Sequence, residues 1–240
     1  MTAAEVEVEP GEVGFDPERL GRLGNHLDQY VDRGCLPGVD VLVSRAGKVV
    51  YRHMYGQRDM ERSLQVEADT IYRFYSMSKP ITSVAIMQLY EQGVFQLKDP
   101  ISNWIPSFAG SQVFVGGDAE NPQIRDASRD ISFHDLLTHT SGLTYHFHMA
   151  HAVDEMYRRA GFDWTRSPGD LENQCDILAS LPLLFDPGTE WNYSYSTDVL
   201  GRLIEVMSGL SLDLYLQRNI FEPLGMVDTG FSVPSEKHER

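Results

Sequence analysis

Apolar residues recur at helical spacing in the first segment of the chain. The segment opens with Gly14-Phe15-Asp16-Pro17, and a proline at the first helical position is a common start signal. The period predicts a helix that begins near Pro17 and presents one apolar face. The positions on that face are Leu20, Leu23, Leu27 and Val31.

A second pattern, short apolar runs separated by a tight turn, follows this helix. Residues 39–43 indicate a buried strand, Ala46-Gly47 a turn, and residues 48–56 a partner strand. The three pieces together predict a β-hairpin. Two strands are marginal in water, so the hairpin requires more sheet or a helix on one face.

The rest of the chain alternates between periodic and polar stretches. Helical spacing and terminal glycines predict helices over 76–91, 196–208 and 212–221, and Ser132 is expected to cap another helix. Residues 107–130 are rich in Gly, Asp, Ser and Asn and are expected to form a loop or an insertion. Residues 140–170 lack periodicity and are expected to be a long, lid-like surface segment with one short helix.

Composition narrows the range of partners. The chain has 240 residues and a net charge of −15, which disfavours nucleic acid and anionic membrane surfaces. No apolar run approaches about 18 residues, and no secretory signal is visible. Cys35 and Cys175 fit no metal or disulfide motif, so we expect two buried free thiols and a cytoplasmic location.

Ser76-Met77-Ser78-Lys79 is the sharpest chemical feature of the sequence. A serine and a lysine three positions apart at a helix start lie on one face. The positive end of the helix favours a developing alkoxide, and a lysine of depressed pKa can accept the serine proton. Taken by itself, the segment is also consistent with a serine that caps the helix and a lysine that is exposed to solvent.

Two further segments reinforce the motif. Leu136-Leu137-Thr138-His139-Thr140-Ser141-Gly142-Leu143 and Pro187-Gly188-Thr189-Glu190-Trp191-Asn192-Tyr193-Ser194-Tyr195 follow it in order. With Ser-x-x-Lys, they resemble the serine β-lactamase and penicillin-binding-protein superfamily. The resemblance extends over nearly the whole chain. It is nearest to the class C-like branch that contains carboxylesterases and fungal acyltransferases.

The resemblance implies a fold, a reaction and a set of roles. The fold is α+β (α/β), with an antiparallel sheet flanked by helices and a mostly helical subdomain. Ser76 would be the acyl-accepting nucleophile, and Tyr193 the base that shuttles protons. Lys79 would activate the serine or maintain the local electrostatic field. The backbone N–H of Ser76 would form half of an oxyanion hole. The reaction would be hydrolysis of a small carboxylic ester through an acyl-enzyme, or transfer of its acyl group to an alcohol, with no cofactor and no metal.

The chain departs from the family pattern at two points. Tyr195 stands where the family carries an asparagine, which weakens a β-lactamase function and favours the esterase branch. The third motif, a Lys-Thr-Gly or a His-x-Gly or Trp-x-Gly variant on a strand, is absent. After Tyr193 the only lysine is Lys237.

The absent motif leads us to expect a chain that corresponds to the N-terminal two-thirds of such an enzyme. Its C-terminal strands would be lost by truncation or proteolysis, or supplied by a second chain. The expected division is residues 1–79 for the helix and hairpin, 80–200 for the helical subdomain with its lid, and 201–240 for helices that return to the sheet.

Three alternatives remain open. One is hydrolysis of β-lactams or of peptidoglycan D-Ala-D-Ala peptides, and another is a non-catalytic family member that lacks the third motif. The third is a metal site at His146-x-His148-x-x-His151, for which no cysteine or carboxylate cluster completes a ligand set except Asp154. A Ser-His-Asp triad is rejected because Ser76 has no Gly-x-Ser-x-Gly elbow.

Overall fold

The computed structural model describes residues 5–164 and 168–240. It forms two compact units, one made of residues 1–73 and 230–240 and the other of residues 74–229. The expected subdomain boundaries after residues 79 and 200 stay a prediction.

The first unit contains the expected N-terminal helix. Helix α1 covers Pro17–Asp32, and the side chain of Asp16 caps it by accepting a hydrogen bond from the backbone N–H of Arg19 at 3.1 Å. A capping carboxylate offsets an unpaired backbone donor and the positive end of the helix dipole. A short 3-10 turn, Pro10–Val13, precedes it, and another, Ser235–Lys237, belongs to the same unit.

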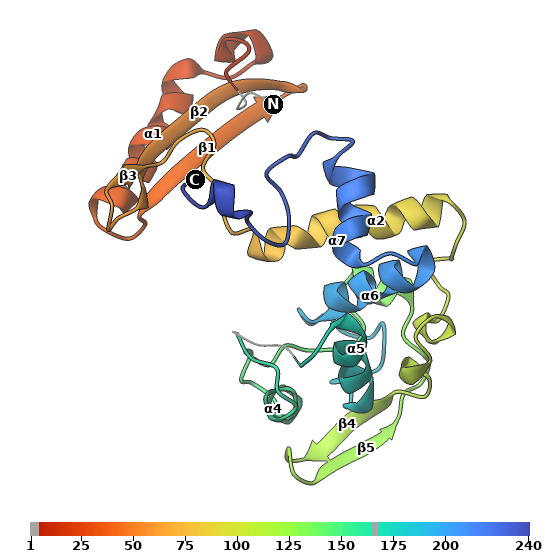
Figure 1. The fold of residues 1–240 in the computed structure, drawn as a ribbon. Helices are drawn as coiled ribbons and strands as arrows, with labels where there is room; N and C mark the ends of the chain where they lie inside the picture. The colour runs from red at the N-terminus through yellow and green to blue at the C-terminus, as the bar shows by residue number, and fades with distance from the viewer. Residues whose placement is uncertain (1–4, 165–167) are drawn as a thin grey trace. The chain divides into compact units, whose positions relative to one another are not determined.

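The expected hairpin is confirmed as the centre of this unit. Strands β1 (Gly38–Arg45) and β2 (Lys48–Asp59) pair antiparallel, and β3 (Leu64–Gln65) joins the far edge of β2. Ala46 and Gly47 make the turn with φ of 53° and 75°, the left-handed geometry of a two-residue hairpin loop. Helix α1 lies along this sheet (Figure 1), where Asp28 and the His53 ring are 2.6 Å apart.

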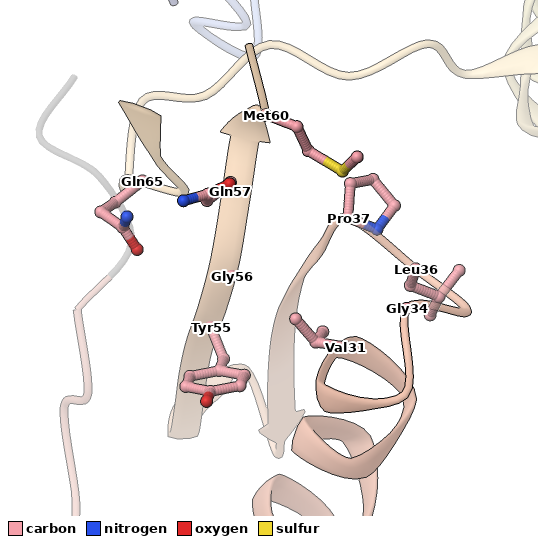
Figure 2. Close-up of a pocket in the computed structure, with 9 residues that line it drawn as sticks. All are labelled: Val31, Gly34, Leu36, Pro37, Tyr55, Gly56, Gln57, Met60 and Gln65. Atoms are coloured by element: carbon pink, nitrogen blue, oxygen red, sulfur yellow. The ribbon is translucent and has the colours of Figure 1, made fainter. Parts of the chain in front are cut away.

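A pocket of about 350 Å³ opens between the end of α1, the turn after it and strand β2. Figure 2 shows Val31, Leu36 and Pro37 on one side of the pocket and Tyr55 and Gln57 on β2. The lining offers aliphatic groups and side-chain amides, and the Tyr55 hydroxyl already donates to Asp32 at 2.9 Å. No serine, cysteine or charged side chain is among the residues that line this pocket.

The second unit is mostly helical, and the helices predicted from periodicity are present. Residue 209 has a φ of 71°, the left-handed conformation that ends a helix at glycine. The segments are turn Tyr75–Met77, α2 (Ser78–Glu91), turns Ile101–Asn103 and Pro106–Phe108, α3 (Phe133–Leu137), α4 (Ala152–Arg159), α5 (Leu171–Ser180), α6 (Ser196–Ser208), and α7 (Leu212–Leu216) continued by the π-helix Gln217–Phe221.

The expectation of a loop over 107–130 was wrong. Strands β4 (Gln112–Gly117) and β5 (Pro122–Asp126) form an antiparallel hairpin there. The polar residues lie in its turn and on either side of the two strands, and in the turn the Asp118 carboxylate accepts hydrogen bonds from the backbone N–H groups of Glu120 and Asn121. The hairpin extends from one end of the helical unit (Figure 1). Its short apolar run was too brief to stand out against that composition.

The expectation of a surface segment over 140–170 was also wrong for the described residues, although the short helix α4 is there. Residues 165–167 lie outside the described part of the chain, and the lid stays a prediction. Leu143, Val153, Tyr157 and Phe162 are buried in the core. Aromatic rings at irregular spacing pack between helices, so the segment shows no period although it is interior. Helix α5, which follows this segment, was not predicted.

Helices α2 and α6 form the centre of this unit, with Ala85, Ile86, Leu203 and Ile204 fully buried. Apolar burial of this kind is the main stabilising contribution to a fold. Cys175 is buried as expected, whereas Cys35 is exposed, which corrects the expectation of two buried thiols. Among the described residues, no helix has the length and apolar character required to cross a membrane.

Candidate active site

Ser76 lies in the tight 3-10 turn that leads into α2, and its side chain is exposed. The preceding residue, Tyr75, has a φ of 46°. A non-glycine residue in this left-handed region is strained, and such strain persists where the surrounding structure fixes it, often at functional sites. The turn therefore presents the serine hydroxyl to solvent at the N-terminal end of α2.

Lys79 stands in the first turn of α2, on the same side as the serine. Its Nζ donates a hydrogen bond to Ser76 Oγ at 3.3 Å. The three-residue spacing in the sequence thus brings an amine to the hydroxyl, as expected for neighbours on one helix face.

Tyr193 reaches the same hydroxyl from a distant part of the chain. Its phenol donates to Ser76 Oγ at 2.6 Å. The structure therefore brings together all three residues that the sequence singled out. The contact closes a triangle in which the serine oxygen has an amine on one side and a phenol on the other.

Two segments running side by side hold Tyr193 in place. The backbone N–H of Asn192 donates to His139 O at 2.9 Å, and the Asn192 side chain donates to Leu143 O at 3.0 Å. The backbone N–H of Tyr195 donates to Thr144 O at 3.3 Å. These bonds connect the two family-like segments of the sequence to each other on both sides of Tyr193.

The Tyr193 phenol is electrostatically tuned by Lys79. Partial burial alone would raise its pKa, but hydrogen bonding to Lys79 and Ser76 and the charge of Lys79 outweigh that effect and lower the pKa below its ordinary value. The Lys79 ammonium lies 4.5 Å from the centre of the Tyr193 ring and 5.6 Å from that of Tyr145. A phenol with a lowered pKa is suited to accept a proton from a serine.

Three residues that the sequence did not assign to the catalytic groups surround this triangle. Tyr145 and His139 contact the Tyr193 ring, with centroids 5.2 Å and 5.0 Å away. Asp198, in the first turn of α6, has its pKa raised by burial to about 6, although the charge of Lys79 opposes the rise. His139 and Tyr145 lie in or beside a motif that was recognised, but only the folded chain shows what they touch.

Tyr195, at the family's asparagine position, is part of the core. Its ring is buried, and its hydroxyl lies 2.6 Å from Nδ1 of His146. Burial raises the pKa of Tyr195 and lowers that of His146, so the pair is neutral at pH 7. Because its hydroxyl contacts His146 in the core, Tyr195 does not take over the role of the family's asparagine side chain beside Lys79.

The three histidines considered as metal ligands have other contacts. His146 pairs with Tyr195, His148 lies 3.4 Å from the Thr144 hydroxyl, and His151 caps α4 by accepting from the backbone N–H of Val153 at 3.3 Å. In the part of the chain that the structure describes, no group of three or more His, Cys, Asp or Glu side chains is placed to hold a metal ion.

The sequence profile of the family described as Beta-lactamase matches residues 23–240. The chain belongs to the beta-lactamase family. This β-lactamase fold accounts for the order of the recognised motifs and confirms the expected α+β class.

Other members of the beta-lactamase family are similar along most of this chain. Esterase EstB of Burkholderia gladioli is 34% identical over 239 residues, which is 96% of this chain and 56% of that protein. ML-236A carboxylate methylbutanoyltransferase of Penicillium citrinum is 35% identical over 205 residues, 82% of this chain and 48% of that protein.

The similarity extends to solved structures of the beta-lactamase family. EstCE1, a hydrolase with promiscuous acyltransferase activity, superposes with a TM-score of 0.77 at 31% identity, covering 91% of this chain and 55% of its own. The chain therefore spans about half the length of the relatives it matches.

Proposed function

We propose that this chain carries a serine hydrolase site that acts on small carboxylic esters through an acyl-enzyme at Ser76. The observation that carries the proposal is that Ser76 Oγ accepts two hydrogen bonds, one from the Lys79 amine at 3.3 Å and one from the Tyr193 phenol at 2.6 Å. A serine is a weak nucleophile unless a neighbouring base accepts its proton, and both neighbours are within reach.

The acylation step follows from this geometry. With Tyr193 as phenolate, its oxygen accepts the Ser76 proton while Oγ attacks the ester carbonyl carbon. The tetrahedral intermediate collapses, its carbon–oxygen bond to the alcohol breaks, and the Tyr193 proton passes to the departing alkoxide. The Lys79 ammonium stabilises the phenolate before and after the transfer.

Deacylation uses the same groups, with a water molecule as the nucleophile and Ser76 as the leaving group. The Tyr193 phenolate accepts a proton from a water molecule, whose oxygen attacks the acyl carbon, and the proton returns to Ser76 Oγ as the ester bond breaks. An alcohol in place of water would give acyl transfer. The similarity to an esterase, a methylbutanoyltransferase and a hydrolase with promiscuous acyltransferase activity supports both outcomes for this class of site.

An ester substrate is preferred over a β-lactam for a structural reason. Tyr195 stands at the position of the family's asparagine, and its side chain is committed to His146 in the core. The amide that would grip a substrate amide and the lysine is therefore not supplied from this position. D-Ala-D-Ala peptides and β-lactams are accordingly the second-ranked substrates.

An intact-mass spectrum after brief exposure to p-nitrophenyl butyrate tests the proposal. We expect one butyryl group on Ser76, located by peptide mapping, and none on Ser76→Ala. Ser83→Ala, which removes another serine of α2, serves as the matched control and should label as the parent does. Label that persists in Ser76→Ala, or no label on the parent chain, contradicts the proposal. Turnover of nitrocefin far above that of nitrophenyl esters would reverse the order of substrates.

A further inference from the structure

His139 lies against the proposed base. It is half-buried, its ring centroid is 5.0 Å from that of Tyr193, and Trp191 packs at 6.3 Å from it. Its backbone has a φ of 56°, the left-handed conformation that ends helix α3, where the backbone N–H of Thr140 donates to Asp135 O at 2.8 Å.

A chain of buried hydroxyls anchors the His139 ring. Its Nδ1 lies 3.3 Å from Ser194 Oγ, Ser194 Oγ lies 2.8 Å from Ser196 Oγ, and Ser196 Oγ lies 2.8 Å from Ser141 Oγ. All three serines are fully buried. The chain thus runs from the ring, through the residues that flank Tyr193, and back to the segment that carries His139.

We propose that His139 is a positioning residue, which holds the Tyr193 phenol over Ser76 and Lys79 by packing against its ring and by anchoring Ser194. The inference rests on the proposed function, because it assigns the support of the base named there. A second bond joins the segments of His139 and Tyr193: the backbone N–H of Asn192, the residue before Tyr193, donates to His139 O at 2.9 Å.

The neutral form of the imidazole suits this role. Burial lowers the pKa of His139, and the charge of Lys79 lowers it further. The other titratable groups around the phenol are Tyr145, from the same segment as His139, and Asp198 of α6. A neutral ring therefore fills the space beside Tyr193 without adding a second cation near Lys79.

Loss of the ring has a predictable electrostatic consequence. Without it, the Tyr193 phenol is free to leave Lys79 and Ser76, which are the groups that lower its pKa. The pKa of Tyr193 then rises towards the ordinary tyrosine value. A purely structural role would lower the melting temperature and leave that pKa unchanged.

Two variants of His139 separate its two contacts. His139→Asn keeps the left-handed backbone, which asparagine tolerates, and removes the ring. His139→Phe keeps a ring beside Tyr193 and removes the hydrogen bond to Ser194. His134→Asn is the matched control, because His134 is an exposed histidine of the neighbouring helix α3.

The first readout is the absorbance titration of tyrosinate in the 240-residue chain, with Tyr193→Phe subtracted to isolate one phenol. We expect His139→Asn to raise that midpoint by about half a pH unit or more, and His134→Asn to leave it in place. The second readout is the rate of Ser76 acylation by p-nitrophenyl butyrate. It should fall about 10- to 100-fold in His139→Asn and less in His139→Phe.

Ser194→Ala keeps the test decisive if a His139 variant fails to fold. It removes the anchor and leaves the ring, so it should shift the Tyr193 midpoint in the same direction as His139→Phe. When Ser194→Ala and His139→Phe are combined, their shifts of the Tyr193 midpoint should be less than additive, because each substitution removes the same hydrogen bond between His139 and Ser194. An unchanged midpoint in folded His139→Asn or in Ser194→Ala overturns the inference. The proposed function fails separately, by the absence of a Ser76 adduct on the parent chain.

Discussion

The amine of Lys79 lies over the face of the Tyr193 ring, 4.5 Å from its centre. The contact joins a cation to the electron-rich face of a phenol, and it comes with hydrogen bonding that lowers the pKa of Tyr193. Lys79 therefore has two partners in this site, the hydroxyl to be activated and the group that activates it.

The first prediction concerns pH. Because the phenolate of Tyr193 is the proposed base and its pKa lies below the ordinary value of about 10, acylation should increase as pH rises through that lowered pKa and then level off. Stopped-flow release of nitrophenolate from pH 6 to 10 measures the profile. A rate that does not change across this range would remove Tyr193 from the proton path.

The second prediction concerns the Tyr193 hydroxyl. Tyr193→Phe keeps the ring under Lys79 and removes the 2.6 Å contact with Ser76. Loss of a general base costs about 10²–10⁴-fold, so both half-reactions should slow, and deacylation at least as much as acylation. Burst and steady-state rates with p-nitrophenyl butyrate separate the two steps. Rates equal to those of the parent would contradict the assigned role.

The third prediction concerns Asp198. Burial raises its folded pKa to about 6, above the unfolded value, so its stabilising contribution is complete near pH 4 and is lost as pH rises through 6. Asp198→Asn should therefore be more stable than the parent at pH 8, by about 1–3 kcal/mol, and no more stable at pH 4. Urea unfolding at both values measures this. Asp176→Asn, on the exposed side of α5, should show no such pH-dependent gain.

The fourth prediction concerns Gly56 of β2. Its φ is 86°, and a Cβ there would come 2.5 Å from Pro37 O, at the wall of the pocket in Figure 2. Gly56→Ala should destabilise the chain by about 2–4 kcal/mol, from backbone strain and the clash together. Gly47→Ala shares the positive φ of 75° but meets no atom within 4 Å, so it should cost only about 1 kcal/mol. Equal midpoints in denaturant for the two variants would show that the clash is relieved.

Elements with local signals were predicted well from the sequence. Helix α6 begins at Ser196 and ends before Gly209, as its apolar period and terminal glycine indicate, and the hairpin turn falls at Ala46-Gly47. The hairpin β4–β5 was missed because its apolar runs are short and the Gly, Asp, Ser and Asn residues around them dominate the composition of the segment. Tertiary contacts rather than local propensity stabilise such strands.

Of the site residues, too, some could be predicted from local sequence and others could not. Ser76 and Lys79 are neighbours on one helix face, so their 3.3 Å contact follows from sequence spacing. Tyr193 came from a resemblance between motifs, and only the fold explains why it arrives at the serine. The neighbours of His139 and Asp198 could not be predicted from nearby residues. Packing between segments far apart in the sequence, and not the spacing within one helix, brings these two residues to the site.

The contact between Tyr193 and Ser76 joins residues 117 positions apart. Closing a loop of that length is entropically costly, and contacts of high sequence separation form slowly. The turn that carries Ser76 is local and can form early, whereas its phenol partner arrives only when α2 and α6 dock. During refolding, the gain of reactivity at Ser76 should therefore lag behind the recovery of helical circular dichroism, and it reports the last stage of assembly of this unit.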